Sequence, residues 1–464
     1  LAMKQKALSV FTLAMINVAA ICSIRNWPLV AIFGFASLFY YTLGSLCFFI
    51  PCALVSAELA STWPERGGVF VWVKKALGHK MGFLAIWLLW AENLFYYPTI
   101  LSFVAAGIAY VIKPMLANNA TYTFFVIFAS FWIATLLNLR GIKTAGWVST
   151  LCALFGTIVP GLLIIGLGMA WWGSGKPMDI VMSWDTLIPK VRSASDFSLL
   201  AGMVLGFAGI EMSAVHAKDV RNAKKNYPRA IALSAFVILI LSVLGTLAIS
   251  IVIPQDNIHL SASAIEAITI FMRSYGLGWL GPVIAFLITV GAFGTMSTWT
   301  VGPIRGLLAA ADEGDFPAFF HKVNRWGMPS TMMVLQAIVV SLCALLFLYS
   351  KNINASYWKL LVLCSQLYII MYALLFLSGI VLKYRFPDKE RPYAVPGGKV
   401  GMWIVSGTGF ITMIFCLIVG FFPPTQVETG SLLAYELFLW IGIAIFCAIP
   451  FLLLRFKKKS WAKS

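Results

Sequence analysis

Long runs of apolar residues follow one another along nearly the whole chain, and short polar connections separate them. A helix needs about 20 apolar residues to cross the hydrocarbon core of a bilayer, and each run is long enough to do so. We therefore expect an all-α polytopic membrane protein. The pattern predicts twelve transmembrane helices, at 8–33, 36–61, 81–112, 121–139, 147–172, 197–217, 228–253, 279–304, 330–349, 357–382, 400–422 and 432–454.

Polar and helix-breaking residues interrupt the first and the sixth of these spans. The first contains the polar stretch 22–26, followed by Pro28, and in the sixth Gly206 and Gly209 precede Glu211. Such interruptions in corresponding members of two halves are typical of the discontinuous helices of transporters built from inverted repeats. Both spans are therefore predicted to be broken.

The spacing of the two interruptions predicts an internal repeat. Spans one and six are five apart, and because five is odd the second half enters the membrane from the opposite side. We expect a first five-helix repeat at 8–172 and a second, inverted repeat at 197–382. Two further helices are expected at 400–455, followed by a short basic tail at 456–464.

The distribution of charge along the chain predicts how the helices are oriented in the membrane. Hydrophobic residues make up 61% of the chain and charged residues 11%, but the net charge is +17. Of the 34 Lys and Arg residues, 26 fall on the side that holds both termini, 7 fall on the other side, and Arg25 lies within a span. This asymmetry follows the positive-inside rule, so both termini are predicted in the cytoplasm. The basic charge thus indicates topology, with membrane lipids as partners and no nucleic acid.

Patterns typical of enzymes or metalloproteins do not occur in the sequence. The eight cysteines show no CxxC or Cys/His spacing, and no nucleophile–base set is recognisable. We expect no catalytic residues, no metal site, no cofactor and no enzymatic activity. Two amphipathic segments, 67–82 and 261–276, are predicted to form short helices near the membrane interface.

Three stretches of sequence carry a family resemblance. Residues 50–83 contain P-x-A-L-x-x-A-E-L followed by P-x-x-G-G, residues 207–230 contain G-x-E, and residues 302–329 form a loop that begins G-P-x-R-G. These stretches resemble the signatures of the amino acid–polyamine–organocation (APC) superfamily, and the most specific likeness is to its bacterial glutamate/γ-aminobutyrate antiporters. The resemblance implies a LeuT-like fold, a multi-pass protein of the bacterial inner membrane, and small-molecule amino acid or amine substrates.

The resemblance also places a substrate site at the two breaks and on span ten. It implies substrate contacts at Cys22, Ser23, Ile24, Arg25, Ala208, Gly209, Ile210, Glu211, Tyr368 and Tyr372. Backbone N–H groups at the end of a half-helix bind carboxylates whatever the side chain. In the superfamily the first break is usually Gly-Ser-Gly-Ile, whereas this chain lacks both glycines, as the antiporter branch also does.

Two acidic residues at mid-span are candidates for coupling transport to charge. A carboxylate at mid-depth marks an ion pathway or a ligand site by default, so Glu211 is expected to carry a proton or to bind a substrate ammonium. Its alternative is a structural role, bonded to freed backbone amides. Glu92 departs from the branch pattern and could be a second proton site, a cation-recognising group or the partner of Arg25.

Three residues are candidates for gates on the substrate path. Tyr368 and Tyr372 share one helical face and match a tyrosine pair that lines the substrate path of the antiporter branch, although packing alone could also explain them. Arg305 ends span eight in the G-P-x-R-G motif. It is a candidate for binding a carboxylate at a cytoplasmic gate, or it is a residue that follows the positive-inside rule.

Arg25 stands where the antiporter branch has a tyrosine that contacts substrate. We hypothesise that it reads an acid group of the substrate, with internal pairing to Glu211 or Glu92 as the alternative. The function expected overall is an antiporter that exchanges an amino acid for a related amino acid or its decarboxylation product by alternating access. Alternatives are a symporter coupled to H⁺ or to Na⁺, for which Ser297 and Thr298 offer hydroxyls, and a ligand sensor with a transporter fold.

Overall fold

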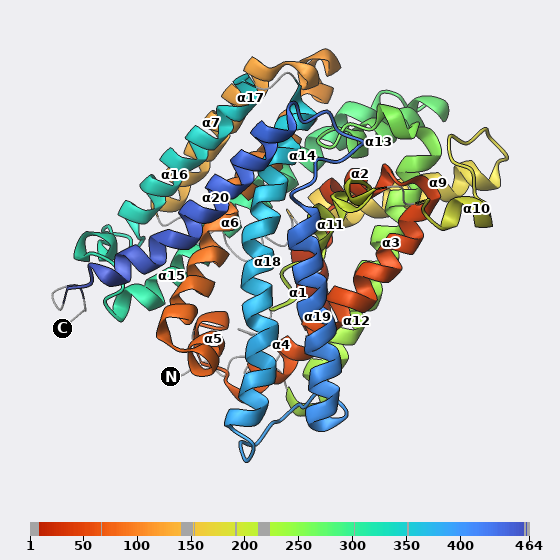
Figure 1. Ribbon diagram of the computed structural model, residues 1–464. Helices are drawn as coiled ribbons and strands as arrows, with labels where there is room; N and C mark the ends of the chain where they lie inside the picture. The colour runs from red at the N-terminus through yellow and green to blue at the C-terminus, as the bar shows by residue number, and fades with distance from the viewer. Residues whose placement is uncertain are drawn as a thin grey trace, which may run out of the picture.

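The computed structural model describes residues 9–65, 67–140, 152, 154–190, 193–211, 223–300, 302–349, 352–458 and 461. Helices make up this described part of the chain, and no strand occurs in it. The long helices run side by side between two ends of the molecule (Figure 1). The connections predicted in the cytoplasm lie at the lower end in this view, and those predicted outside lie at the upper end.

Ten helices in the described residues are long and apolar enough to cross a membrane, and all ten coincide with predicted spans. Five are the single helices α6 (His79–Ile112), α7 (Ala120–Leu139), α18 (Ile353–Arg385), α19 (Gly398–Val419) and α20 (Leu432–Arg455). Two are the apolar stretches Lys225–Val252 of α12 (Ala223–Val252) and Leu280–Ser297 of α14 (Leu280–Trp299). Three combine shorter elements: Gly34–Thr62 includes α3 (Ser37–Gly44), η3 (Ser45–Phe49) and α4 (Ile50–Thr62); Leu154–Gly173 includes η5 (Leu154–Ile158) and α9 (Val159–Gly173); and Ser330–Tyr349 includes α16 (Ser330–Ala344) and α17 (Leu346–Tyr349). The two remaining predicted spans are the first and the sixth, which are the two predicted to be broken.

The first predicted span is interrupted as its sequence indicates. Helix α1 (Val10–Ile21) ends at Cys22, Ser23 is extended, and a single turn of 3₁₀-helix, η1 (Ile24–Asn26), leads into α2 (Trp27–Ala31). Pro28 lies at the start of α2 and cannot donate a backbone hydrogen bond, so a continuous helix through residue 24 is disfavoured. Local chemistry therefore determines where this span breaks.

Packing against α12 holds the segment after the first break in place. The ring of Trp27 lies against Gly245, where an added Cβ would approach the ring to 2.3 Å. A larger side chain at 245 would therefore collide with Trp27, so the absence of a side chain there sets how closely the two segments approach. Asn17 on α1 also donates to the Ser234 hydroxyl of α12, at 3.2 Å.

The sixth predicted span is also interrupted. Helix α11 (Leu199–Gly206) ends in a turn at Phe207–Gly209, and Gly209 has a φ of +111°. Residues with a Cβ rarely adopt such a φ, so this turn requires glycine. Ile210 and Glu211 continue the chain, and the other part of the predicted span, from residue 212 onward, lies outside the described residues.

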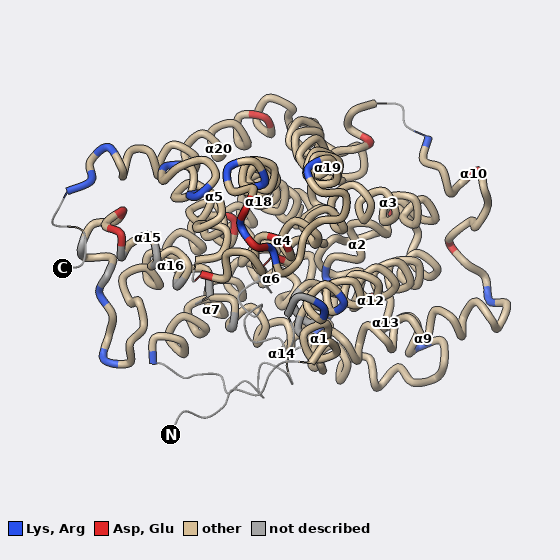
Figure 2. The backbone as a smooth tube through the Cα atoms, turned by 90° about the horizontal axis from the view of Figure 1, so that it is seen from below, with Lys and Arg blue, Asp and Glu red and all other residues tan. Residues whose placement is uncertain are grey.

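Helices α6 and α18 form the centre of the molecule, where they pack against each other (Figure 1). They have 34 and 33 residues and bury most of their surface within the protein, whereas α19 and α20 lie at the periphery. Lys and Arg lie mainly in connections and at helix ends (Figure 2). A few charged residues lie near α4, α6 and α18 in the same view.

Short helices complete the described chain. The two amphipathic segments form α5 (Val69–Leu77) and α13 (Ser263–Ser274), as their pattern predicts. Both bury their apolar faces on the bundle, and they lie at opposite ends of it (Figure 1). The other short elements are η2 (Gly34–Ala36), η4 (Pro114–Asn118), α10 (Trp184–Leu187), η6 (Ala194–Phe197), η8 (Gln255–Asn257), α15 (Gly302–Asp312) and η9 (Ala318–His321).

Candidate substrate site

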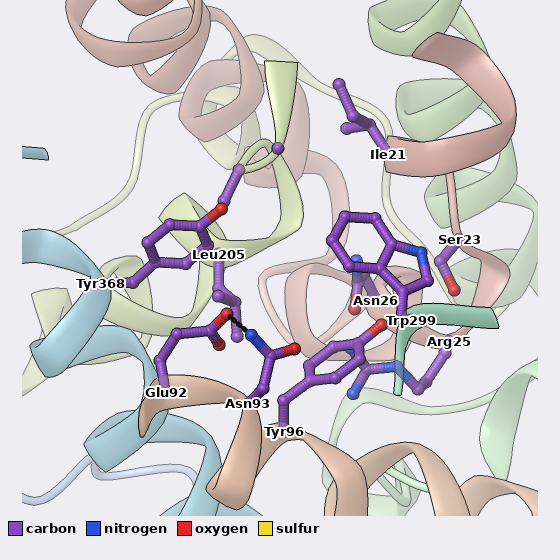
Figure 3. Close-up of a pocket in the computed structure, with 12 residues that line it drawn as sticks. Ile21, Ser23, Arg25, Asn26, Glu92, Asn93, Tyr96, Leu205, Trp299 and Tyr368 are labelled. Atoms are coloured by element: carbon purple, nitrogen blue, oxygen red, sulfur yellow. Dashed lines mark hydrogen bonds between the residues drawn. The ribbon is translucent and has the colours of Figure 1, made fainter. Parts of the chain in front are cut away.

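A small cavity of about 60 Å³ lies where the two broken spans meet α6 (Figure 3). Its walls come from the first break, from the turn after α11, from α6 and from single residues of α14 and α18. The lining residues are Ile21, Ser23, Arg25, Asn26, Glu92, Asn93, Tyr96, Leu205, Ala208, Gly209, Trp299 and Tyr368. The cavity therefore combines one cation, one carboxylate, two amides and three aromatic rings.

Arg25 contributes the positive charge of this cavity, although its side chain is only 1% exposed. Its Nη1 donates to the Thr99 hydroxyl at 3.1 Å and to the Tyr357 hydroxyl at 3.0 Å, and its guanidinium lies 4.7 Å from the centre of the Tyr96 ring. Its Nε has no hydrogen-bond partner in the part of the chain that the structure describes. Among the described residues no carboxylate forms an ion pair with Arg25, so neutral groups alone hold this guanidinium.

Glu92 contributes a carboxyl group from α6, and its side chain is 5% exposed. The neighbouring Asn93 amide donates to Oε1 at 2.5 Å, and the Cys364 thiol of α18 donates to Oε2 at 3.1 Å. In Figure 3, Glu92 and Arg25 lie on opposite sides of the cavity, with Asn93 and Tyr96 between them. The two charges therefore belong to separate walls and do not neutralise each other by contact.

Glu211 lies beside the cavity without lining it, and its side chain is 2% exposed. The Tyr368 hydroxyl donates to Oε1 at 2.6 Å, and the Tyr372 hydroxyl donates to Oε2 at 2.7 Å. The backbone N–H of Gly209 lies 3.2 Å from Oε2 and also donates to the Tyr372 hydroxyl at 2.9 Å. The tyrosine rings stack at 4.7 Å. This network ties the sixth span to α18.

The predicted site residues divide into two groups. Ser23, Arg25, Ala208, Gly209, Glu92 and Tyr368 line the cavity. Cys22, Ile24, Ile210, Glu211 and Tyr372 are buried next to it but do not line it. Arg305 belongs to α15, and its side chain lies outside the described residues, as does that of Thr298. The hydroxyl of Ser297 accepts a hydrogen bond from Asn138 at 3.0 Å.

Several residues of the site had no assigned role from sequence. Tyr96 and Thr99 follow Glu92 at intervals of four and three residues on one helix, so helical spacing could have placed them on the same face. Tyr357 is 332 positions from Arg25, and no local pattern connects them. Asn26 was recognisable only as part of the first break, and Trp299 had no signal in the sequence that its side chain faces a cavity.

One buried carboxylate away from the cavity, that of Glu58, is neutralised by basic residues of the protein. Glu58 of α4 pairs with Lys383 at 2.9 Å and with Arg391 at 2.8 Å. Both oxygens of Glu58 therefore have protein partners, since Oε2 also accepts from the backbone N–H of Val395 at 2.6 Å. This cluster contrasts with Arg25, whose charge has no acidic partner in the described residues.

A second charged cluster lies at the end of the molecule that holds α5. His79, Glu313 and Asp315 come close enough to suit a metal ion. However, Lys74 bonds Glu313 at 2.6 Å and Lys457 bonds Asp315 at 2.8 Å. Lysine ammonium groups thus already compensate both carboxylates, and the cluster joins three separate segments of the chain.

The chain is similar to known transport proteins over nearly its whole length. A Legionella pneumophila protein described as an uncharacterized transporter is 40% identical over 448 residues, which cover 97% of this chain and 96% of the relative. The glutamate/gamma-aminobutyrate antiporter of Lactococcus lactis is 30% identical over 463 residues, or 98% of this chain and 92% of that antiporter. A probable agmatine/putrescine antiporter of the same species is 24% identical over 441 residues, 92% and 90% of the two chains.

Many apolar helices around a buried polar cavity at two broken spans are the architecture of a multi-pass membrane transporter. The relatives are transporters from bacterial membranes, in agreement with this class. The sequence pattern of one family, described as amino acid permease, matches residues 8–446. The chain belongs to this family, which confirms the resemblance to the APC superfamily.

Proposed function

We propose that this protein is an antiporter that exchanges an amino acid for a related amino acid or its decarboxylation product. The observation that carries the proposal is the cavity at the two breaks. One wall holds a guanidinium that has no counter-ion within the described part of the chain, and the other wall holds a carboxyl group. A buried charge without a partner is costly, so a ligand that supplies the opposite charge gains affinity. A molecule with one carboxylate and one ammonium matches both walls.

The two charges also favour one kind of exchange pair. The freed backbone of Ser23–Arg25 holds the α-carboxylate, the Arg25 guanidinium reads a second acid group, and Glu92 faces the ammonium. Decarboxylation removes the α-carboxylate but leaves a side-chain acid in place, so both members of the pair keep a group for Arg25. Glutamate and γ-aminobutyrate form such a pair, whereas agmatine and putrescine have no carboxylate. The cavity thus supports the exchange named for the 30% identical relative.

Alternating access would move the broken spans against α6 and its neighbours. We propose twelve spans in a five-plus-five inverted repeat with two additional helices, and both termini in the cytoplasm. Spans one, two, six and seven would rock against spans three, four, eight and nine. The bonds from Tyr368 and Tyr372 to Glu211 join span six to span ten, so these tyrosines are proposed to close the path, with Arg305 at the cytoplasmic gate.

Counterflow in proteoliposomes tests this function. Purified protein is reconstituted, the vesicles are loaded with unlabelled glutamate, γ-aminobutyrate, putrescine or no substrate, and uptake of radiolabelled glutamate is followed. We expect internal glutamate and γ-aminobutyrate to accelerate uptake and internal putrescine to have no effect. Uptake that does not depend on internal substrate, is driven by an acidic exterior or by external Na⁺, and collapses when that gradient is removed would indicate a symporter. Saturable binding without any flux would indicate a ligand sensor.

A further inference from the structure

Glu92 is a buried carboxylate that lines the substrate cavity and has no cation within reach among the described residues. We infer that Glu92 carries a proton in the empty site and gives it up when a substrate ammonium arrives, so that proton and ammonium compete for one carboxylate. This inference rests on the proposed function, because it assigns a coupling role within the same site.

The groups that face Glu92 do little to stabilise a negative charge. Its hydrogen-bond donors are an amide, from Asn93, and a thiol, from Cys364, and a thiol is a weak donor. The ionisable groups that interact with it are Cys364 and Tyr368 of α18, Tyr96 and Tyr97 of α6, and Glu211 of the sixth span. The cavity wall from α14 is Trp299, which does not ionise. Arg25 is the one cation that lines the cavity among the residues that the structure describes, and it lies on the opposite side (Figure 3).

A buried carboxylate that lacks a cationic partner can be neutralised by a proton. Burial of an isolated carboxylate is so costly that the group normally takes up a proton instead. An ammonium that enters the cavity changes this balance, because an opposite charge at contact distance favours the ionised form. Glu92 therefore has two ways to be neutralised, and the substrate decides between them.

Glu211 differs from Glu92 in whether its carboxylate oxygens are available to a substrate ammonium. Three donors converge on its two oxygens, two of them hydroxyls at 2.6 and 2.7 Å, and it does not line the cavity. Its oxygens are already occupied, so an entering ammonium would have to displace the tyrosines. Glu92 keeps capacity for a new partner and faces the ligand directly.

The step is balanced in charge and atoms. A substrate R–NH₃⁺ meets the carboxylic acid of Glu92, the O–H bond of that acid breaks, and the proton leaves to water. The product is the ion pair between R–NH₃⁺ and the Glu92 carboxylate. When the substrate leaves, the carboxylate takes up a proton again from the side to which the site is open.

This competition has a consequence for transport. Exchange of one ammonium-bearing substrate for another moves no net proton through Glu92. If the empty site returns across the membrane with Glu92 protonated, however, one proton moves in the direction opposite to the substrate. Vesicles without internal substrate should then take up glutamate faster when their interior is acidic, which is the reverse of what a proton symporter does.

Isothermal titration calorimetry of the purified full-length protein directly measures the release of protons when substrate binds. Glutamate is titrated at one pH into buffers with different ionisation enthalpies, and the slope of the apparent enthalpy gives the protons released. We expect close to one proton released per glutamate bound. The affinity should also rise with pH over a range in which the charges of the substrate do not change, because the bound state holds fewer protons than the free state. Wild-type protein that binds glutamate without releasing a proton would overturn the inference.

Three variants separate this role from a structural one. Glu92→Gln removes the exchangeable proton and should release none, with pH-independent affinity. Glu92→Asp keeps a carboxylate and should restore release, even if its affinity is lower, which guards against a Gln variant that fails to fold. Glu211→Gln is the matched control, because each glutamate bound to it should still release a proton. Release that persists in Glu92→Gln would contradict the inference.

Counterflow and calorimetry together distinguish a failure of the proposed function from a failure of the role assigned to Glu92. If the wild-type protein shows no glutamate or γ-aminobutyrate counterflow in vesicles, the proposed function fails. If counterflow is present but calorimetry detects no proton release, the exchange function stands and only the role of Glu92 fails.

Discussion

The two interrupted spans differ in how the protein treats the charged residue at each break. At the first break, Arg25 is bonded by two hydroxyls and an aromatic ring, and its Nε has no partner. At the second, Glu211 accepts hydrogen bonds from two tyrosines and one backbone amide. Both side chains are almost completely buried, so burial alone does not distinguish them.

The difference indicates which break contacts the ligand through its side chain. A carboxylate with three donors is already stabilised and has little to gain from a ligand, whereas a guanidinium held by neutral groups gains strongly from an incoming carboxylate. The second break therefore shapes the cavity through its backbone and its link to α18. We propose that the first break supplies the charge that selects the substrate.

Replacing Arg25 should have the largest effect on binding. Arg25→Ala removes one partner of the proposed buried charge pair, a loss of at least about 2 kcal/mol, or about 30-fold in affinity. The loss should be confined to substrates with an acid group for Arg25, namely the side-chain carboxylate of acidic amino acids or the carboxylate of γ-aminobutyrate. Competition of radiolabelled glutamate uptake by a panel of amino acids measures it. Equal loss for acidic and neutral amino acids would indicate that Arg25 only supports the structure.

Arg25→Lys is the matched variant for the same comparison. It keeps a positive charge but loses the planar guanidinium that reaches both Thr99 and Tyr357. We expect it to keep the preference for acidic substrates with lower affinity. A Lys variant as unselective as the Ala variant would show that the geometry of the guanidinium matters more than its charge.

Replacing Glu211 should affect stability more than substrate preference. Glu211→Gln replaces a charged acceptor of three donors by an amide with a single acceptor oxygen, so we expect a loss of about 3 kcal/mol in the free energy of unfolding. Thermal unfolding in detergent, followed by the loss of monodisperse protein, measures it. A variant with wild-type stability but no substrate selectivity would reverse the roles that we assign to the two breaks.

The two tyrosines on Glu211 sharpen this comparison, because only Tyr368 lines the cavity. Tyr372→Phe and Tyr368→Phe each remove one hydrogen bond to the same carboxylate, with an expected loss of about 1.5 kcal/mol in stability. We expect the apparent affinity for glutamate to change in Tyr368→Phe and not in Tyr372→Phe. Equal changes in uptake kinetics would mean that both act through Glu211.

Replacing Gly209 should have the smallest effect of these substitutions on stability. With a φ of +111°, Gly209→Ala should destabilise the protein by about 1 kcal/mol, although space exists, since the nearest atom to an added Cβ is 3.7 Å away. Gly206→Ala is the matched control, because Gly206 is helical and has the same 3.7 Å clearance. We expect that control to be neutral or slightly stabilising. Thermal unfolding of both variants distinguishes backbone strain from crowding.

Local sequence patterns were sufficient to predict the helices. Each span is long and apolar enough by itself, and ten continuous helices occur where the pattern predicts them. The interruption of the first span follows from Pro28 and that of the sixth from Gly209, because each acts on its own backbone. The amphipathic period of residues 263–274 likewise predicted α13.

The composition of the site could be predicted only in part. Arg25, Glu92 and Glu211 were recognisable because charges are rare within apolar spans. The sequence did not show whether these residues pair with one another, because pairing depends on how helices that are distant in the sequence pack. Tyr357, which bonds Arg25, comes from α18, and Cys364 reaches Glu92 across 272 positions of sequence.

The sequence by itself determined that this chain crosses a membrane many times, where two of its spans break and which rare charges they contain. These properties depend on the length, hydropathy and backbone freedom of individual segments, and each segment carries them alone. Only the tertiary structure decided that Glu211 is saturated by tyrosines of α18 while Arg25 and Glu92 face one cavity from opposite walls. The physical reason is that hydrogen bonds and charge compensation form between helices, and the packing of those helices decides which side chains meet.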